Sequence, residues 1–328
     1  MRNWFLGLSL ALMAVVSGLA RIDEASAQAY PSRPVTLIVP FPAGGVTDII
    51  ARIVGDRLRV SLGQPVIAEN VAGAVGTIGL TRLFRSAPDG YTIGIGQWTS
   101  NVGGGAMYQL PFDIRTDLQP LSLLSVGTMW IIGRKDLPAQ NLQELIAWLK
   151  AHPNATAGTI GAGSGAHMCL VYFANKAGVQ LQYVPYRGAA PAMQDLLAGQ
   201  IDLSCPEAGQ TLAQYRAGSI KPYGVLMDRR WFAAPDIPTI GEAGVPDVQF
   251  PFWHGLWAPK GTPDDIVAKL NAAIVETLAD PTVRARLTEL GHEVVPRDQQ
   301  TPAALAAYHK AETEKWWPII KAANIKAD

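Results

Sequence analysis

The chain has 328 residues, of which 48% are hydrophobic and 16% charged, and its 27 Lys and Arg balance its 27 Asp and Glu. This composition excludes a disordered chain and a coiled coil, and the zero net charge argues against a nucleic-acid surface. A neutral protein can attract an anion only through local dipoles, because it has no global positive field.

The first 29 residues have the pattern of a secretory signal peptide. Arg2 precedes an apolar run at 4–20, and a polar stretch then ends in two A-x-A sites, which predict cleavage after Ala27 or Ala29. The alternative is a membrane anchor, but the apolar run is marginal for spanning a bilayer. We therefore expect an exported, periplasmic protein. Separately, we expect it to be a monomer.

Strand-like and helical patterns alternate through the first part of the mature chain. The expected elements are a strand at 35–41, a helix at 47–63, a strand at 64–70, a helix at 77–87, and a turn with a strand at 87–96. This β-α-β-α-β order predicts a doubly wound, parallel sheet.

A second α/β round follows, and helices close the chain. We expect strands at 128–138, 155–165, 179–186, 201–206 and 221–227, and helices at 141–153, 166–178, 188–200, 262–280, 281–291 and 301–323. Asn141 is the expected N-cap of one helix and Gly178 the expected C′ residue of another.

Two α/β units joined by two crossings predict two domains with a cleft between them. Candidate hinge strands are 128–134 and 252–258. The predicted domains are 30–130 together with 252–328, and 131–251. Ligands of open α/β sheets bind beyond the carboxyl ends of the strands, so the cleft is the expected site.

Two glycine-rich turns stand between a strand and a helix, VPFPAGG at 39–45 and TIGAGSG at 159–165. Small residues there expose backbone N–H donors at the positive end of a helix, where an anion can bind. One such turn in each domain indicates a carboxylate clamp across the cleft. The alternative is two independent structural turns.

The catalytic and metal-binding motifs that we tested are incomplete in this sequence. Alanines at 162 and 166 break the glycine pattern of a nucleophile elbow around Ser164. The remaining enzymatic alternative is a secreted hydrolase that uses Ser164 and His167, which lie three residues apart. The histidines have no metal-ligand spacing, and no cofactor is expected. Cys169 and Cys205, the only cysteines, can form a disulfide or remain two buried thiols.

Several stretches together resemble one family. YPSRPVTLIVPFPAGGVTDIIAR at 30–52, APDGYTIGIG at 87–96, VPYRGAAPAMQDLLAGQIDL at 184–203 and GLWAPKGTPDDIVAKLNAAI at 255–274 are similar to landmarks of the Bug/TctC family. These are periplasmic solute receptors of tripartite tricarboxylate transporters. The resemblance covers 30–328. It implies a two-domain Venus-flytrap fold of the type II-like class, no catalysis, a small carboxylate ligand, and membrane transporter subunits or a sensor protein as the partner.

The resemblance also places binding residues. The first loop and the glycine-rich second loop carry most of them. The segment after GYTIGIG at 90–96 adds polar and aromatic groups, and the return strand adds two rings. These candidates are Phe41, Ala43, Gly44, Gly45, Thr47, Asp48, Gln97, Trp98, Thr99, Ser100, Ala162, Gly163, Ser164, Gly165, His167, Glu207, Trp253 and His254. We expect Asp48 to hold its loop in place, since a carboxylate repels an anionic ligand.

Three departures from the family pattern bear on the ligand. Val171 and Pro206 stand where the family often has acidic residues, and Val71-Ala72-Gly73 stands for the common Arg-Pro-Gly. A ligand ammonium would lack a counter-charge, which is costly in a buried site. The aromatic candidates offer flat apolar area. We therefore expect an aromatic acid or a dicarboxylate in preference to an amino acid. The alternative for Phe41 and Trp253 is an ordinary core position.

Overall fold

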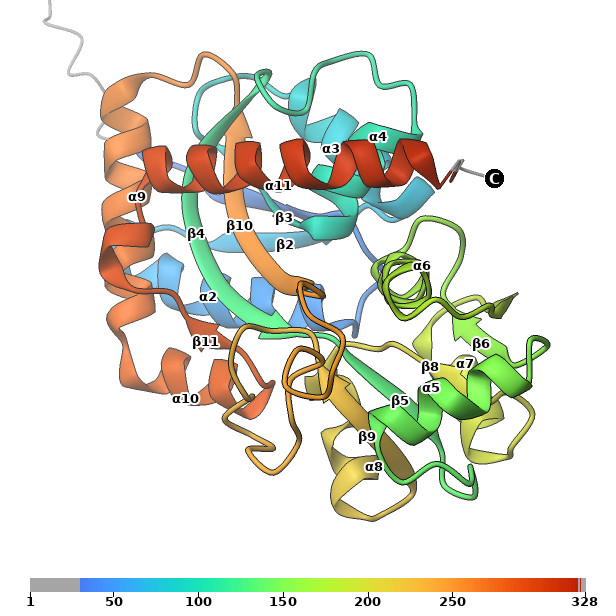
Figure 1. The fold of residues 1–328 in the computed structure, drawn as a ribbon. Coiled ribbons are helices and arrows are strands. Elements are labelled where there is room, and N and C mark those ends of the chain that lie inside the picture. The colour runs from blue at the N-terminus through green and yellow to red at the C-terminus, as the bar shows by residue number, and fades with distance from the viewer. Residues whose placement is uncertain (1–29, 324, 326–328) are drawn as a thin grey trace, which may run out of the picture.

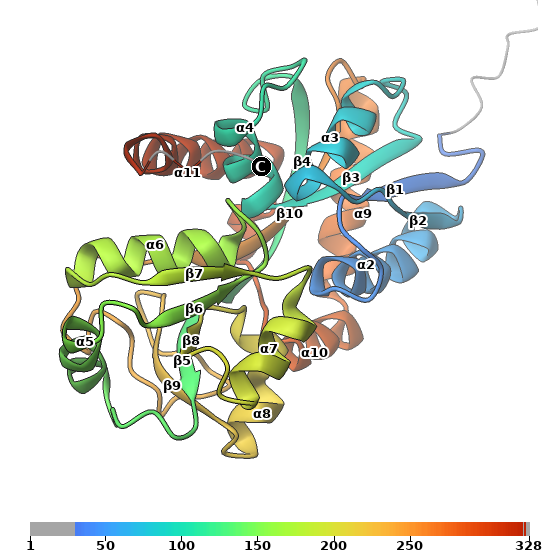
Figure 2. The same ribbon diagram turned by 90° about the vertical axis from the view of Figure 1, so that its right-hand side faces the viewer.

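The computed structural model describes residues 30–323 and 325, so the predicted signal peptide lies outside the described residues. The described chain forms two sheets with helices on both faces of each (Figures 1 and 2). Two sheets in one chain agree with the predicted two-domain binding-protein architecture.

The first sheet has six strands in the order β11-β4-β10-β3-β1-β2. Its strands are β1 (Val35–Val39), β2 (Val66–Asn70), β3 (Thr92–Gln97), β4 (Leu118–Thr128), β10 (Pro251–Pro259) and β11 (Glu293–Val294). The predicted parallel pairing is correct for β2, β1 and β3. β10 runs antiparallel to both β3 and β4, because it enters this sheet from the opposite end on its return from the second sheet.

The second sheet has five strands in the order β7-β6-β8-β5-β9. Its strands are β5 (Trp130–Arg134), β6 (Thr156–Thr159), β7 (Gln182–Pro185), β8 (Leu203–Ser204) and β9 (Ile220–Val225). β7, β6 and β8 are parallel, whereas β5 runs antiparallel to β8 and β9. Both sheets are thus mixed.

The chain passes between the two sheets twice, from β4 to β5 and from β9 to β10. Met129 alone separates β4 from β5, so a nearly continuous extended segment crosses from one sheet to the other. The sequence pattern placed only the second part of this segment, and the 11-residue β4 was missed. The predicted strand at 252–258 is confirmed as β10, all of it within the first sheet.

Helices enclose the first sheet on both faces. α2 (Val46–Leu62), α9 (Asp264–Ala279) and α10 (Pro281–Glu289) share one apolar core with β1, β3 and β10. α3 (Thr77–Phe84), the short α4 (Gly104–Met107) and the long α11 (Pro302–Ala322) pack on the other face, where α11 crosses β4 and β10 (Figure 1). Burial on both faces explains the unbroken apolar run of β1.

The second sheet is covered in the same way. α5 (Leu142–Ala151) and α6 (Gly165–Ala177) lie on one face, and α7 (Ala189–Leu197) and α8 (Leu212–Arg216) on the other. The predicted helix ends are confirmed, since the Asn141 side chain accepts from the Glu144 N–H and Gly178 takes a left-handed φ of 64°. No helix of the described residues is long and apolar enough to cross a membrane.

Candidate functional site

A cavity of about 890 Å³ lies between the two sheets. The six-stranded sheet and its helices, called the first unit below, contribute the loop Phe41–Thr47, Gln97 and Thr99, and Phe252 of β10. The five-stranded sheet and its helices, the second unit, contribute Met129, Ile160, the first residues of α6 and α7, and the end of β8 with the segment after it. From these parts come Gly165, Ala166, the stretch Arg187–Gln194, Leu197, Ser204, Pro206, Glu207, Gln210, Thr211 and Gln214.

The loop between β1 and α2 is shaped by one buried carboxylate. Gly44 has a φ of 83°, in the region that favours glycine, and its N–H donates to Asp48 Oδ2 at 2.9 Å. Arg52 Nε and Asn70 Nδ2 donate to the same carboxylate at 3.0 and 2.9 Å. Asp48 thus binds its own loop and does not line the cavity, as the sequence suggested from charge repulsion.

These hydrogen bonds also control the charge of Asp48. Burial by itself would raise the pKa of its carboxyl. The hydrogen bonds from Arg52, Gly44 and Asn70 outweigh burial and hold that pKa below its usual value. Asp48 is therefore ionised at neutral pH, and the Arg52 guanidinium forms an ion pair with it at 3.0 Å.

Three helices begin at this cavity. α2 starts after Gly45 and α7 after Gly188, and neither has a side-chain cap for its first N–H groups. α6 starts after Ser164, whose Oγ accepts only the His167 N–H, so the preceding N–H groups of Gly165 and Ala166 remain at the cavity wall. Helix N-termini carry partial positive charge, so the cavity offers converging donors for an anion.

Two charged side chains of the described residues line the cavity, Arg187 and Glu207. The Glu207 carboxylate contacts His292 Nε2 through Oε1 and accepts from Gln210 Nε2 through Oε2 at 3.1 Å. Arg187 is exposed, and no carboxylate of the described residues pairs with it. The cavity therefore holds one carboxylate that already has partners and one guanidinium that has none.

Comparison with known proteins assigns this architecture. A family model described as tripartite tricarboxylate transporter family receptor matches residues 50–325. This chain belongs to that receptor family. Among solved structures, the periplasmic binding protein BugD is 37% identical, with a TM-score of 0.82, and the match covers 91% of this chain and 100% of BugD.

Two further relatives were solved with ligands. MatC from Rhodopseudomonas palustris, with bound malate, is 35% identical with a TM-score of 0.81 over 89% of this chain and 100% of MatC. Another R. palustris protein, with adipate, is 31% identical with a TM-score of 0.82 over 91% of this chain and 100% of that protein. The Bug/TctC resemblance read from the sequence is confirmed. The family consists of solute-binding receptors and not enzymes.

Not every predicted site residue of the receptor reaches the cavity. Phe41, Ala43, Gly44, Gly45, Thr47, Gln97, Thr99, Gly165 and Glu207 line it. Trp98 and Trp253, expected at the cleft, are fully buried, because Trp98 packs between Phe250 and Trp316 and Trp253 packs against Tyr308. Ser100 is also buried, and its hydroxyl donates to the Gln97 carbonyl and to Asn101.

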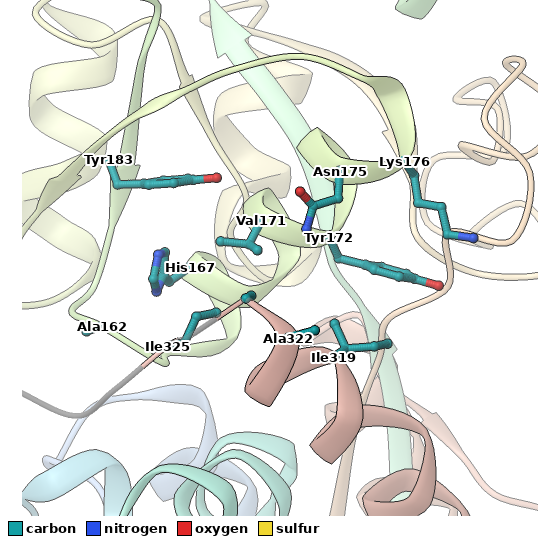
Figure 3. A pocket seen from close by; sticks show the side chains of 11 residues that line it. Ala162, His167, Val171, Tyr172, Asn175, Lys176, Tyr183, Ile319, Ala322 and Ile325 are labelled. Atoms are coloured by element: carbon teal, nitrogen blue, oxygen red, sulfur yellow. The ribbon is translucent and has the colours of Figure 1, made fainter.

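The second glycine-rich loop is divided between two environments. Gly165 faces the main cavity, but Ala162 and His167 line a separate cavity of about 720 Å³ beside α6, β7 and the end of α11 (Figure 3). Ser164 donates to the Gly161 carbonyl and caps the His167 backbone N–H. The His167 ring accepts from the Gly163 N–H and meets the edge of Tyr183. The serine hydroxyl is thus engaged with backbone, as in an ordinary helix cap.

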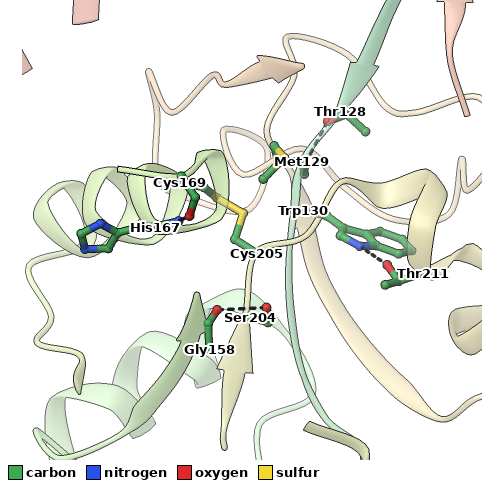
Figure 4. The surroundings of a disulfide bond; sticks show 10 residues. Thr128, Met129, Trp130, Gly158, His167, Cys169, Ser204, Cys205 and Thr211 are labelled. Atoms are coloured by element: carbon green, nitrogen blue, oxygen red, sulfur yellow. Dashed lines mark hydrogen bonds between the residues drawn. A yellow bond between two sulfur atoms is a disulfide. The ribbon is translucent and has the colours of Figure 1, made fainter. Parts of the chain in front are cut away.

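A disulfide joins Cys169 in α6 to Cys205 just after β8 (Figure 4). Both residues are fully buried. The bond links the helix whose first residues line the cavity to the segment that carries Ser204 and Glu207. Of the two states that the sequence left open for these cysteines, the structure contains the disulfide.

Arg187 and Gly188 line the cavity but were not among the predicted site residues, although they lie within the family landmark at 184–203. The signal was available, because Gly188 directly precedes a helix as Gly45 does in the first loop. Met129 and Phe252 were also missed. Met129 sits in the single-residue link between the sheets, and nothing in its local pattern indicates a cavity.

Proposed function

We propose that this receptor is periplasmic and binds a small organic dicarboxylate in the cavity between its two domains. The carrying observation is the convergence of three helix starts and one unpaired arginine on a single cavity. We place the domain boundaries at 130/131 and 251/252, so that the cavity lies between the units. The ligand is handed to membrane subunits of a tripartite transporter, or its presence is signalled to a sensor protein, and the receptor acts as a monomer.

One carboxylate is proposed to bind where the first loop faces α6. Gly44 and Gly45 leave the backbone donors of α2 uncovered, and Thr47 adds a hydroxyl at the cavity wall. On the opposite wall Gly165 and Ala166 bring the start of α6. Backbone N–H groups at two facing helix ends suit the two oxygens of one carboxylate.

Arg187 supports a second carboxylate on the ligand. A guanidinium at the cavity edge without a protein partner is a natural partner for an anion, and Arg binds carboxylates in bidentate geometry. The relatives solved with malate and adipate carry dicarboxylates in the same fold. An aromatic monoacid is less well supported, because Trp98 and Trp253 are core residues and Phe41 and Phe252 remain as the cavity rings.

An amino acid is also a poor match. Glu207 is the one carboxylate of the described residues at the cavity, and both of its oxygens already have partners in His292 and Gln210. A ligand ammonium would have to displace one of them or remain without a counter-charge. Pro206 lines the same cavity at a position where the family resemblance implies an acidic residue, which points the same way, whereas Val171 lines the separate cavity beside α6.

The test is a thermal-shift and calorimetric screen of the mature protein with succinate, malate, adipate, benzoate, aspartate and glutamate. Ligand at 100 times its dissociation constant should stabilise the fold by about 2.7 kcal/mol. We expect stabilisation by dicarboxylates and little by benzoate or the amino acids. Tight binding of aspartate without a response to the other dicarboxylates would overturn the proposed ligand class. Arg187→Gln should weaken the dicarboxylate and leave a monocarboxylate of equal length unaffected, with Arg216→Gln as the control.

A further inference from the structure

A buried histidine stands behind the cavity wall formed by Thr47. His254 lies on β10 with no exposed surface, and its Nε2 is 3.0 Å from Thr47 Oγ1. It was expected to touch the ligand, but it does not line the cavity. Thr47 does line it and is 6% exposed. Any influence of His254 on a ligand therefore passes through the Thr47 hydroxyl.

The environment of His254 keeps its ring neutral. Burial, and after it the nearby His292, lowers the pKa of His254 well below its ordinary value. The neighbouring rings are His292 at 5.2 Å and Phe252 at 5.5 Å between centroids. His292 is itself held by Glu207 and by Ser125 Oγ. A neutral imidazole has one N–H, so His254 must place its single proton on Nδ1 or on Nε2.

The two nitrogens have unequal surroundings. Nδ1 of His254 is buried and has no hydrogen-bond partner among the described residues, whereas Nε2 faces Thr47. A proton on Nδ1 would create a buried donor without an acceptor, which folded proteins avoid more strictly than an unused acceptor. The proton therefore belongs on Nε2, and the Thr47 oxygen is the acceptor of that bond.

We propose that His254 is a positioning residue that fixes the Thr47 hydroxyl as a hydrogen-bond donor to the ligand. With its oxygen occupied by His254, the hydroxyl hydrogen has no acceptor among the described residues and is directed to the cavity that Thr47 lines. A donor hydroxyl beside the helix-start amides favours a carboxylate and disfavours a ligand group that donates. This inference rests on the proposed carboxylate function and assigns its selectivity to a residue outside the cavity.

The test is a double-mutant cycle on the affinity for whichever of succinate, malate or adipate binds most tightly. Thr47→Val removes the hydroxyl at nearly constant shape and should weaken binding by about tenfold. His254→Leu should weaken it by a similar or smaller factor. The double variant should bind no more weakly than Thr47→Val alone, because His254 acts only through that hydroxyl. Thr47→Ser, which keeps a hydroxyl, should retain most of the affinity.

Independent effects that multiply in the double variant, or an unchanged affinity in His254→Leu, would overturn the proposal. Nitrogen-15 NMR of the unliganded wild-type protein provides a second readout that needs no variant to fold. We expect His254 Nε2 to be protonated and Nδ1 unprotonated, and the reverse assignment would also overturn the proposal. If none of the three dicarboxylates binds the wild type, the proposed function fails while this NMR measurement still decides the tautomer.

Discussion

The two glycine-rich loops look alike in the sequence but differ in what surrounds them. At Gly44 an added Cβ would meet nothing within 4 Å, so this loop opens to the cavity. At Gly163 it would lie 2.0 Å from Met107 Sδ, so this loop packs against the first unit. The first loop is held by the Asp48 carboxylate, and the helix after the second loop by a disulfide. Similar local patterns therefore border open space at Gly44 in one loop and make contact between the two units at Gly163 in the other.

The largest expected effect is a loss of stability when the disulfide beside the second loop is removed. The double variant Cys169→Ala, Cys205→Ala opens a loop that the disulfide closes across 36 residues of sequence. Because the unfolded chain then has more conformational freedom, we expect a loss of about 4 kcal/mol of unfolding free energy. Urea unfolding of the oxidised wild type and the double variant measures this. Free-thiol labelling of the unreduced, unfolded wild type is the control, and two reactive thiols there would contradict the bond.

Substitution at Gly44 should break ligand binding and leave the fold intact. Gly44→Val adds a β-branched side chain at φ 83° beside the uncovered donors of α2, and we expect a loss of affinity of about 100-fold. Gly63→Val is the matched control, because Gly63 ends the same helix at φ 68° in equally open space. Equal affinities in the two variants, measured by calorimetry, would remove the first loop from the site.

Substitution at Gly163 should act on stability first. Gly163→Ala combines a φ of 71° with a collision against Met107, and we expect a loss of about 2 kcal/mol. Gly161→Ala has a positive φ of 103° but no neighbour within 4 Å, so it measures backbone strain alone. If thermal unfolding showed the same loss in both variants, the contact with Met107 would have no energetic role.

The smallest expected effect is the pH dependence of the first loop. Because the pKa of Asp48 is held below its unfolded value, its contribution is present above about pH 4 and is lost as the pH falls through the folded pKa. Asp48→Asn should cost about 1 kcal/mol at pH 7 and show a smaller loss of stability than wild type as the pH falls below about 4. Parallel acid-unfolding curves for the two proteins would contradict this.

Much of this protein follows from local sequence. Apolar periodicity predicted α2, and the sequence pattern also predicted α9 and α11. Asn141 begins its helix with a side-chain cap, and Gly178 ends its helix with a left-handed φ. These features depend on residues within one or two turns of each other, so a single sequence contains them. The family landmarks identified the receptor class for the same reason.

Tertiary structure decided which side chains face the cavity. Trp98 and Thr99 are neighbours in sequence, yet one packs in the core and the other lines the cavity. The Thr47–His254 contact joins residues 207 apart, and the antiparallel entry of β10 depends on a return from the second sheet. Local periodicity reports that a residue is apolar or polar but not which distant element covers it. Long-range packing therefore decided which of the candidates from the sequence line the cavity.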